Sequence, residues 1–182
     1  MPLTLQIKKL SKSNKFLRII WKLVWVLLYR PTPRSFHKWR CFLLRLFGAK
    51  IGVGVHPYPS AAIWAPWNLI MADNSCLSEY VDCYNVDQIS IGKNYTVSQY
   101  SFLCTASHDY TKVGMPLITG PITIADDVWI MADVFISPGL KIGEGSIVGA
   151  RSSVFTNIPP WVIFKGNPAI QCRIRNHPQN ID

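Results

Sequence analysis

Aliphatic residues recur at every sixth position in the second half of the chain, and this spacing restricts the fold more than any other feature. A helix would need a spacing of about 3.6 residues and a single strand would alternate, so a period of six fits neither. It predicts short strands joined by turns, with three hexads closing one triangular coil of ~18 residues and successive coils stacking about 4.8 Å apart. The longest unbroken run is Ile124, Ile130, Ile136, Ile142, Val148 and Val154.

Earlier parts of the chain keep the same step. Ile91, Val97 and Leu103 form one run, and Met71 and Leu77 begin another, with Cys83 as a weak third member. Small residues such as Gly92 and Gly149 often follow the aliphatic residue, where the chain must turn. We therefore expect an all-β chain whose aliphatic residues stack inside a solenoid. A β-sandwich is the structural alternative.

The ladder breaks between Leu103 and Ile124, which are 21 residues apart. Three hexads would span about 18 residues, so residues 109–120 are expected to form a loop expelled from the coil. Loops on a rigid scaffold often carry function. His108 is the last residue before this loop, and an imidazole held there could act as a general base. Asp109 could orient that ring through Nδ1, or it could simply begin the turn.

The first fifty residues differ from the rest of the chain in charge. The whole sequence of 182 residues has 19 Lys and Arg against 10 Asp and Glu, a formal charge of +9, and twelve of the basic residues fall between Lys8 and Lys50, where there is no acid. Such an excess favours anionic partners. Nucleic acid is the weaker interpretation, because the sequence has no zinc finger and no RNA-binding signature.

Two amphipathic helices are expected in this basic segment, over residues 16–28 and 36–48. The first is apolar on one face, is interrupted by Arg18 and Lys22, and is too short to span a bilayer, which takes about 20 residues. Either the helices pack on the main domain or on a neighbouring subunit, or residues 8–47 lie on an anionic membrane surface. The two interpretations are compatible.

Several segments resemble the hexapeptide-repeat acyltransferases. They are IGKNYTVSQYSFLCTASHDY (91–110), PITIADDVWIMADVFISPGLKIGEGSIVGARSSV (121–154) and IPPWVIFKGNPA (158–169). RPTPRSFHKWRCFLLRLFGAKIG (30–52), IWAPWNL (63–69) and VDCYN (81–85) are similar to the O-acetyltransferases of exopolysaccharide biosynthesis, of the colanic-acid type.

The resemblance implies a left-handed parallel β-helix that assembles as a homotrimer. We expect N-terminal helices over 1–50, the β-helix over 51–168 and a short basic extension over 169–182. The implied reaction moves an acetyl group from acetyl-CoA to a hydroxyl of a sugar or lipid-linked oligosaccharide, during extracellular or capsular polysaccharide biosynthesis. The expected location is the cytoplasm, with peripheral attachment to the inner face of the cytoplasmic membrane as a further expectation.

The resemblance also assigns roles to single residues. His108 would be the general base, acting by direct transfer at a trimer interface. In related sugar acetyltransferases an asparagine of the adjacent subunit faces this histidine. A second break in the ladder, between Cys83 and Ile91, offers Asn85 for that role. Asp82 is the runner-up, and the alternative for Asn85 is a plain turn residue.

Coenzyme A would lie in a groove between coils of adjacent subunits. Trp129, Ala132, Gly149 and Ala150 match the positions that line this groove, and Lys165 and Arg173 lie where cations would meet the nucleotide phosphates. Met131 departs from the family pattern, which has a small residue there.

Other functions remain open at this point. An N-acyltransferase acting on an amino sugar belongs to the same reaction class, and a solenoid that serves as a non-enzymatic scaffold is a rival of another class. We expect no metal, since the repeat region has only His56 and His108 for a γ-type carbonic anhydrase, which would need three histidines. The five cysteines form no CxxC pair, which argues against a zinc site and a disulfide framework.

Overall fold

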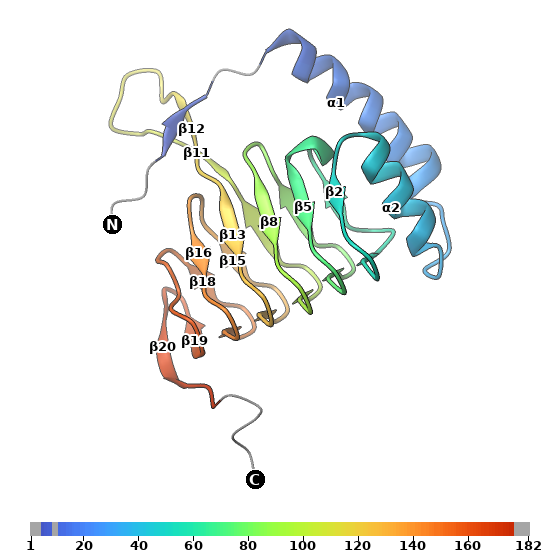
Figure 1. Ribbon diagram of the computed structural model, residues 1–182. Helices are drawn as coiled ribbons and strands as arrows, with labels where there is room; N and C mark the ends of the chain where they lie inside the picture. Colours follow the sequence, from blue (N-terminus) through green and yellow to red (C-terminus); the bar gives the residue numbers. More distant parts are fainter. Residues whose placement is uncertain (1–4, 9–10, 177–182) are drawn as a thin grey trace.

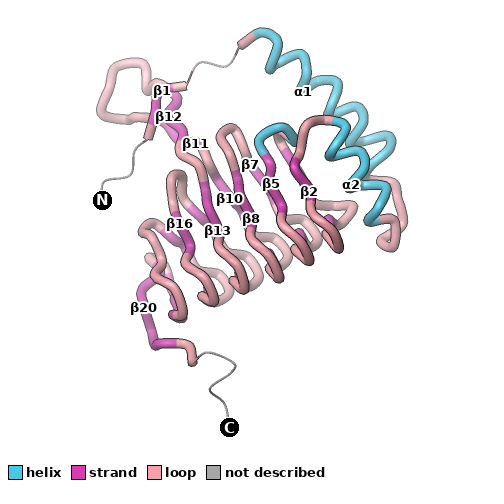
Figure 2. The backbone as a smooth tube through the Cα atoms, in the orientation of Figure 1, coloured by secondary structure: helices cyan, strands magenta, loops and turns pink. Residues whose placement is uncertain are grey.

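Three parallel sheets, each built from one short strand per coil, form the walls of a solenoid (Figures 1 and 2). The computed structural model describes residues 5–8 and 11–176. The predicted parallel β-solenoid is confirmed. The first sheet contains, in spatial order, β2 (Lys50–Ile51), β5 (Leu69–Met71), β8 (Ile89–Ile91), β13 (Ile122–Ile124) and β16 (Lys141–Ile142).

The second and third sheets follow the same order along the axis. The second contains β4 (Ala62–Ile63), β7 (Asp82–Tyr84), β10 (Phe102–Cys104), β15 (Phe135–Ile136) and β18 (Ser153–Val154). The third contains β3 (His56–Pro57), β6 (Cys76–Leu77), β9 (Thr96–Val97), β14 (Trp129–Ile130), β17 (Ile147–Val148), β19 (Val162–Gly166) and β20 (Ala169–Ile174). Strand β20 pairs antiparallel with β19, so residues 169–174, expected in the extension, close this sheet.

The predicted aliphatic ladders fill the interior. The six members of the longest run are each at most 2 % exposed, and Cys83, the weak member of an earlier run, is fully buried. Their strands pair in register: Ile91, Ile124 and Ile142 lie side by side in three successive coils. Burial of these side chains stabilises each coil only through its neighbours, which is why the repeat must be continuous.

The expelled loop leaves the solenoid as a hairpin. Strand β11 (Ala106–His108) pairs antiparallel with β12 (Leu117–Thr119), and β12 pairs with β1 (Gln6–Ile7). Figure 1 shows this small sheet beside the coils, joined to the N-terminal segment. A piece of chain distant in sequence therefore holds the base of the loop in place.

Helices cover the N-terminal end of the solenoid. They are α1 (Lys12–Val24), the π-helical η1 (Trp25–Tyr29), α2 (His37–Leu46) and the short 3₁₀ turn η2 (Pro66–Asn68). Ser11 caps α1 by accepting a hydrogen bond from the Asn14 backbone N–H. The indole N–H groups of Trp21 and Trp25 donate to the carbonyl oxygens of Ile63 (2.7 Å) and Ala61 (3.0 Å), which fixes α1 on the solenoid.

The face that α1 buries is not its most apolar face. Trp21 is buried, as is Tyr29 of η1, whereas twelve large apolar side chains of the helical segment are exposed at its surface. We call this surface the outer stripe: Phe16, Leu17, Ile19, Ile20, Leu23, Val26, Leu27, Leu28, Phe36, Trp39, Phe42 and Leu46. The helices thus pack on the main domain while the outer stripe meets solvent. Among the described residues, no helix has the length and hydropathy needed to cross a bilayer.

Helix α2 differs from its expected amphipathic pattern at Arg40. This residue is completely buried and donates to the carbonyl oxygens of Pro57 (2.7 Å), Pro33 (2.8 Å) and Arg34 (2.6 Å). Desolvation by burial lowers the pKa of Arg40. Its guanidinium satisfies carbonyl groups of the 30–36 turn, so the residue serves as a clamp between the two helices and not as part of a solvent face.

Candidate active site

His108 stands at the base of the expelled loop, opposite Leu117 in the β11–β12 pair. Its ring Nδ1 lies 2.7 Å from the main-chain oxygen of Met115. A carbonyl oxygen only accepts hydrogen bonds, so Nδ1 carries the proton of the neutral ring and Nε2 keeps its lone pair. The side chain is exposed. An imidazole with its tautomer fixed in this way is suited to take a proton from a hydroxyl group.

Asp109 does not orient the ring, because the Met115 carbonyl occupies Nδ1. The Asp109 carboxylate instead accepts hydrogen bonds from the Thr111 N–H (3.1 Å) and hydroxyl (2.5 Å), and Lys112 lies 3.3 Å away. The bonds from Thr111, followed by those of Lys112, lower the pKa of the Asp109 carboxyl. Of the two roles considered for Asp109, the geometry matches the second, the start of the turn.

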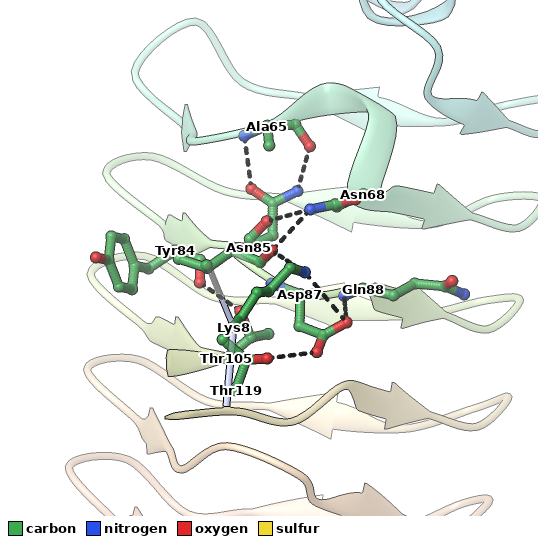
Figure 3. A network of polar contacts seen from close by, with 10 residues as sticks. Lys8, Ala65, Asn68, Tyr84, Asn85, Asp87, Gln88, Thr105 and Thr119 are labelled. Carbon is green, nitrogen blue, oxygen red and sulfur yellow. Dashed lines mark hydrogen bonds and ion pairs between the residues drawn. The ribbon is translucent and has the colours of Figure 1, made fainter. Parts of the chain in front are cut away.

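A polar junction anchors the hairpin that carries His108 (Figure 3). Asp87 accepts hydrogen bonds at Oδ2 from the Thr119 hydroxyl (2.8 Å) and at Oδ1 from the Gln88 N–H (2.8 Å). The Asp87 N–H donates to the Thr105 hydroxyl (2.9 Å), which in turn donates to the carbonyl of Tyr84 (2.8 Å). Thr105 and Thr119 are buried. The junction therefore fixes both ends of the expelled segment to one neighbouring coil.

Two side chains from elsewhere complete the polar junction. Lys8 Nζ donates to the carbonyl of Val86 (2.8 Å) and lies 3.9 Å from Asp87 Oδ1. The Asn68 amide donates to the same carbonyl at 2.9 Å. Sequence reasoning singled out neither Thr105 nor Thr119. The sequence feature that could have indicated them is a hydroxyl residue on each side of the expelled loop, together with the acid Asp87 in the second break of the aliphatic ladder.

Asn85 lies inside the solenoid and has no exposed surface. Its Oδ1 accepts from the Ala65 N–H (2.9 Å) and its Nδ2 donates to the Ala65 carbonyl (2.6 Å), as Figure 3 shows. This pairing makes the side chain a cross-coil brace for the chain just before η2. A side chain enclosed in its own subunit does not present its amide to a histidine of another subunit, so the structure gives Asn85 a structural position.

Asp82, the runner-up, opens into a pocket beneath α1. This aromatic pocket has a volume of about 400 Å³ and is lined by Arg18, Trp21, Lys22, Trp25, Ala62, Ile63, Trp64, Asp82 and Tyr84. The Arg18 guanidinium lies 3.7 Å from the centre of the Trp64 ring, and Trp64 meets Tyr84 edge to face. Part of Asp82 meets solvent, yet partial desolvation raises the pKa of its carboxyl. Aromatic rings with a carboxylate and two cations can hold a polar ring that bears an anionic group.

The residues expected to bind the donor fall on one edge of the solenoid. Ala132 and Ala150 occupy equivalent turns of neighbouring coils, where the Arg151 N–H donates to the Ala132 carbonyl (2.9 Å). Together with Gln99, Tyr100, Asp133 and Arg151 they line a hollow of about 460 Å³. Trp129 projects from the adjacent strand β14, is partly exposed, and donates through its indole N–H to the Ser98 hydroxyl (3.1 Å).

Gly149 and Lys165 are neighbours along this edge. The Gly149 N–H donates to the Phe164 carbonyl (2.8 Å), and a Cβ at Gly149 would lie 3.0 Å from Lys165 Cβ. Arg173 lies opposite Ile163 in the β19–β20 pair, so the two cations share the C-terminal end of the third sheet. Both are exposed, as binding of phosphate groups would require, and Met131 is half-buried beside Gly149 in the next coil.

Known proteins share both the sequence and this architecture. A family model described as bacterial transferase hexapeptide, with six repeats, matches residues 121–156. The putative colanic acid biosynthesis acetyltransferase WcaF of Escherichia coli K12 is 42 % identical over 156 residues, 86 % of this chain and 86 % of its own. The chain belongs to the hexapeptide-repeat acyltransferases.

Solved structures of this family share the fold. A hexapeptide-repeat acetyltransferase from Vibrio cholerae, complexed with acetyl-CoA, superimposes with a TM-score of 0.83 at 25 % identity, covering 94 % of each chain. A galactoside acetyltransferase in complex with coenzyme A gives a TM-score of 0.84 at 23 % identity, covering 97 % of this chain and 92 % of the other. As a member of the hexapeptide-repeat acyltransferases, the chain is an acyl-transfer enzyme.

Proposed function

We propose that this acyltransferase moves an acetyl group from acetyl-CoA to a sugar hydroxyl in the biosynthesis of an extracellular polysaccharide. The relative from Escherichia coli is named for colanic acid biosynthesis, and the Vibrio cholerae neighbour contains acetyl-CoA. The observation that carries the proposal is the fixed tautomer of His108, whose Nδ1–H is bound to the Met115 carbonyl.

The chemistry needs one base that later acts as an acid. Nε2 of His108 removes the proton of the sugar hydroxyl as its oxygen attacks the thioester carbonyl of acetyl-CoA. The tetrahedral intermediate then expels the coenzyme A thiolate, which takes the proton from the imidazolium. The products are an acetyl ester and coenzyme A, and no acyl-enzyme forms. A backbone N–H or polar group must stabilise the oxyanion during the attack.

The donor and the base lie at opposite ends of the second sheet within one chain. The turns that hold Tyr100 and Ala132 precede β10 and β15, which are paired in the second sheet, whereas His108 follows β10, roughly 25 Å of extended chain after Tyr100. We therefore propose a homotrimer in which the donor groove of Ala132 and Ala150 meets His108 of another subunit. Lys165 and Arg173 would bind the phosphates of coenzyme A.

We assign the acceptor to the aromatic pocket. Sugars present a flat apolar face that stacks on rings such as Trp64 and Tyr84, and hydroxyl groups that a carboxylate such as Asp82 can bind. Arg18 and Lys22 at the rim suit the phosphate of a lipid-linked saccharide. We further propose that the enzyme works at the cytoplasmic face of a membrane, where such an acceptor is presented.

The test is release of coenzyme A from acetyl-CoA in the presence of a panel of neutral sugars, lipid-linked oligosaccharides and amino sugars. His108→Ala should lower kcat by at least ~10²-fold, since a general base contributes that much or more. His56→Gln is the matched control and should keep its activity, because His56 stacks on His37 beside α2 (4.5 Å between ring centres) and lies in the first coil.

Three results would overturn the proposal. Full activity of His108→Ala would show that His108 is not the general base. Turnover confined to amino sugars would show that the enzyme is an N-acyltransferase. Absence of coenzyme A release with every acceptor would leave the solenoid without the proposed reaction.

A further inference from the structure

The outer stripe consists of large apolar side chains of α1, η1 and α2 that are exposed in the described chain. Leu27 is 66 % exposed and Leu23 is 57 % exposed, although both belong to regular helical structure that packs on the solenoid through its other side. Figure 1 shows α1 as the outermost element along this flank, with α2 beside it. Exposed apolar patches of this extent on soluble proteins usually mark a binding surface.

A basic edge runs along the outer stripe. Lys15, Arg18 and Lys22 lie one helical turn apart and, with Ile19 and Leu23, line a hollow of about 430 Å³ where cations and aliphatic side chains meet. Within the part of the chain that the structure describes, neither Lys15 nor Lys22 forms an ion pair with a carboxylate. These charges are free to meet an external anionic partner.

We infer that the outer stripe and its basic edge dock on an anionic lipid bilayer, with α1 lying in the plane of the interface. A helix with one apolar side and a cationic flank inserts the former among acyl chains and places the latter among headgroup phosphates. Each basic residue near an anionic surface strengthens binding further.

Charge decides against a second copy of the chain as the occupant of the stripe. The first 72 residues contain no acid, since Asp73 is the first one, so stripe against stripe would bring two basic edges together. An anionic bilayer complements both the apolar and the basic part of the surface.

Docking has a consequence for the acceptor. Arg18 and Lys22 line both the basic hollow and the aromatic pocket, so a bilayer on the outer stripe brings the rim of that pocket to the depth of the headgroups. This consequence rests on the proposed function, because it takes the aromatic pocket as the acceptor site. The docking itself does not, and it can be measured without acetyl transfer.

The experiment is co-sedimentation of the full chain with vesicles of phosphatidylcholine, alone or mixed with anionic phosphatidylglycerol. The wild-type protein should bind the anionic vesicles, and raising the salt from 0.1 to 1 M should weaken binding because the screening length falls from ~10 to ~3 Å. Leu23→Ser with Leu27→Ser should lower the partition constant at least tenfold. Lys12→Gln, at the exposed first residue of α1, combined with Lys15→Gln should lower it about 25-fold, or roughly fivefold per cation.

Matched controls lie on the solenoid. Ile170→Ser changes an aliphatic residue of similar exposure, 64 %, on β20, and Lys93→Gln with Lys141→Gln removes two exposed cations from the coils. These variants should bind like the wild type. Circular dichroism checks that every variant is folded, and release of coenzyme A with a soluble acceptor is measured in parallel, so a failed reaction and a failed docking are distinguished.

Three outcomes would overturn the inference. The wild type could fail to bind anionic vesicles, or the Leu23 and Leu27 variant could bind as well as the control. In the third case, the Leu23 and Leu27 variant dissociates an oligomer of the protein in sedimentation velocity, which would make the outer stripe a subunit interface.

Discussion

Replacement of Asn85 separates a structural from a catalytic role. Asn85→Ala removes both hydrogen bonds to buried Ala65, at 2.9 and 2.6 Å, and leaves the Ala65 N–H without a partner, while the Ala65 carbonyl keeps the hydrogen bond from the Asn68 N–H (2.9 Å). An unsatisfied buried polar group costs about 1–3 kcal/mol and loss of the second hydrogen bond about 0.5–1.5 kcal/mol, so the free energy of unfolding should fall by about 1.5–4.5 kcal/mol. For a chain of this length that corresponds to a decrease in Tm of roughly 5–15 °C.

The assay combines thermal unfolding at fixed protomer concentration with kcat at a temperature where the variant is folded. Asn85→Ala should retain kcat within a few-fold, whereas loss of a group that touches the reacting atoms would lower it by ~10²-fold. Asn176→Ala, at an exposed position, is the control and should change stability by less than ~0.5 kcal/mol. A variant with unchanged Tm and a collapsed kcat would refute the structural assignment and return Asn85 to the catalytic centre.

Three further predictions concern the anchor of the loop, the aromatic pocket and the donor groove. Thr119→Val removes the hydroxyl that binds Asp87, so the free energy of unfolding should fall by about 1.5–3 kcal/mol. Steady-state assays should show a lower kcat at constant KM for acetyl-CoA. Thr119→Ser should restore both the stability and kcat. The pKa of Asp82 is raised by desolvation, so the ionised carboxylate opposes folding. Asp82→Asn should therefore raise Tm at pH 7, and the gain should vanish below about pH 3, where folded and unfolded states are both protonated. Lys165→Gln with Arg173→Gln should raise KM for acetyl-CoA roughly tenfold and leave KM for the sugar unchanged, which initial rates against each substrate will show.

The solenoid could be predicted from the sequence because its period is local and strict. A residue such as Ile130 or Val148 is buried wherever the six-residue step continues, and its neighbours in space are those one coil before and after. The weak position Cys83 followed the same rule, since the register of the flanking strands places it inside whatever its chemistry. Nothing beyond the count of residues per coil was needed.

The orientation of the helices could not be predicted in this way. Helical periodicity identifies an apolar face, but it does not say whether the solenoid or a partner covers it. In α1 the indole hydrogen bonds of Trp21 and Trp25 to main-chain oxygens decide the orientation, and these depend on edge carbonyls that only the folded first coils expose. The burial of Arg40 is likewise not visible in the helical period, because its partners are carbonyl groups and not acids.

The site shows where sequence spacing stops being informative. The sequence singled out His108 as a candidate base from its place before the expelled loop, but the partner of its Nδ1 is a main-chain oxygen seven residues later, which no side-chain motif reveals. Asp109 and Asn85 attracted attention as polar side chains near a break. The structure uses the first for a turn and the second to brace Ala65.

The two breaks in the aliphatic ladder, after Cys83 and after Leu103, are structurally connected. The loop before Ile124 adds residues to one coil, and the break after Cys83 adds two residues beyond the hexad to the coil before it. Expulsion of a loop leaves main-chain groups at its base without their ladder partners, and buried groups of this kind must be satisfied. At the base of the loop the Thr105 N–H donates to the Tyr84 carbonyl and the Gly120 N–H donates to the Thr105 carbonyl. Asp87, supplied by the second break, adds hydrogen bonds to the side chains of Thr105 and Thr119 at the two ends of the loop. The second break thus supplies a side-chain anchor for the expelled loop, so a chain with a regular hexad in place of residues 84–90 should lose the fixed position of His108 while its remaining coils still stack.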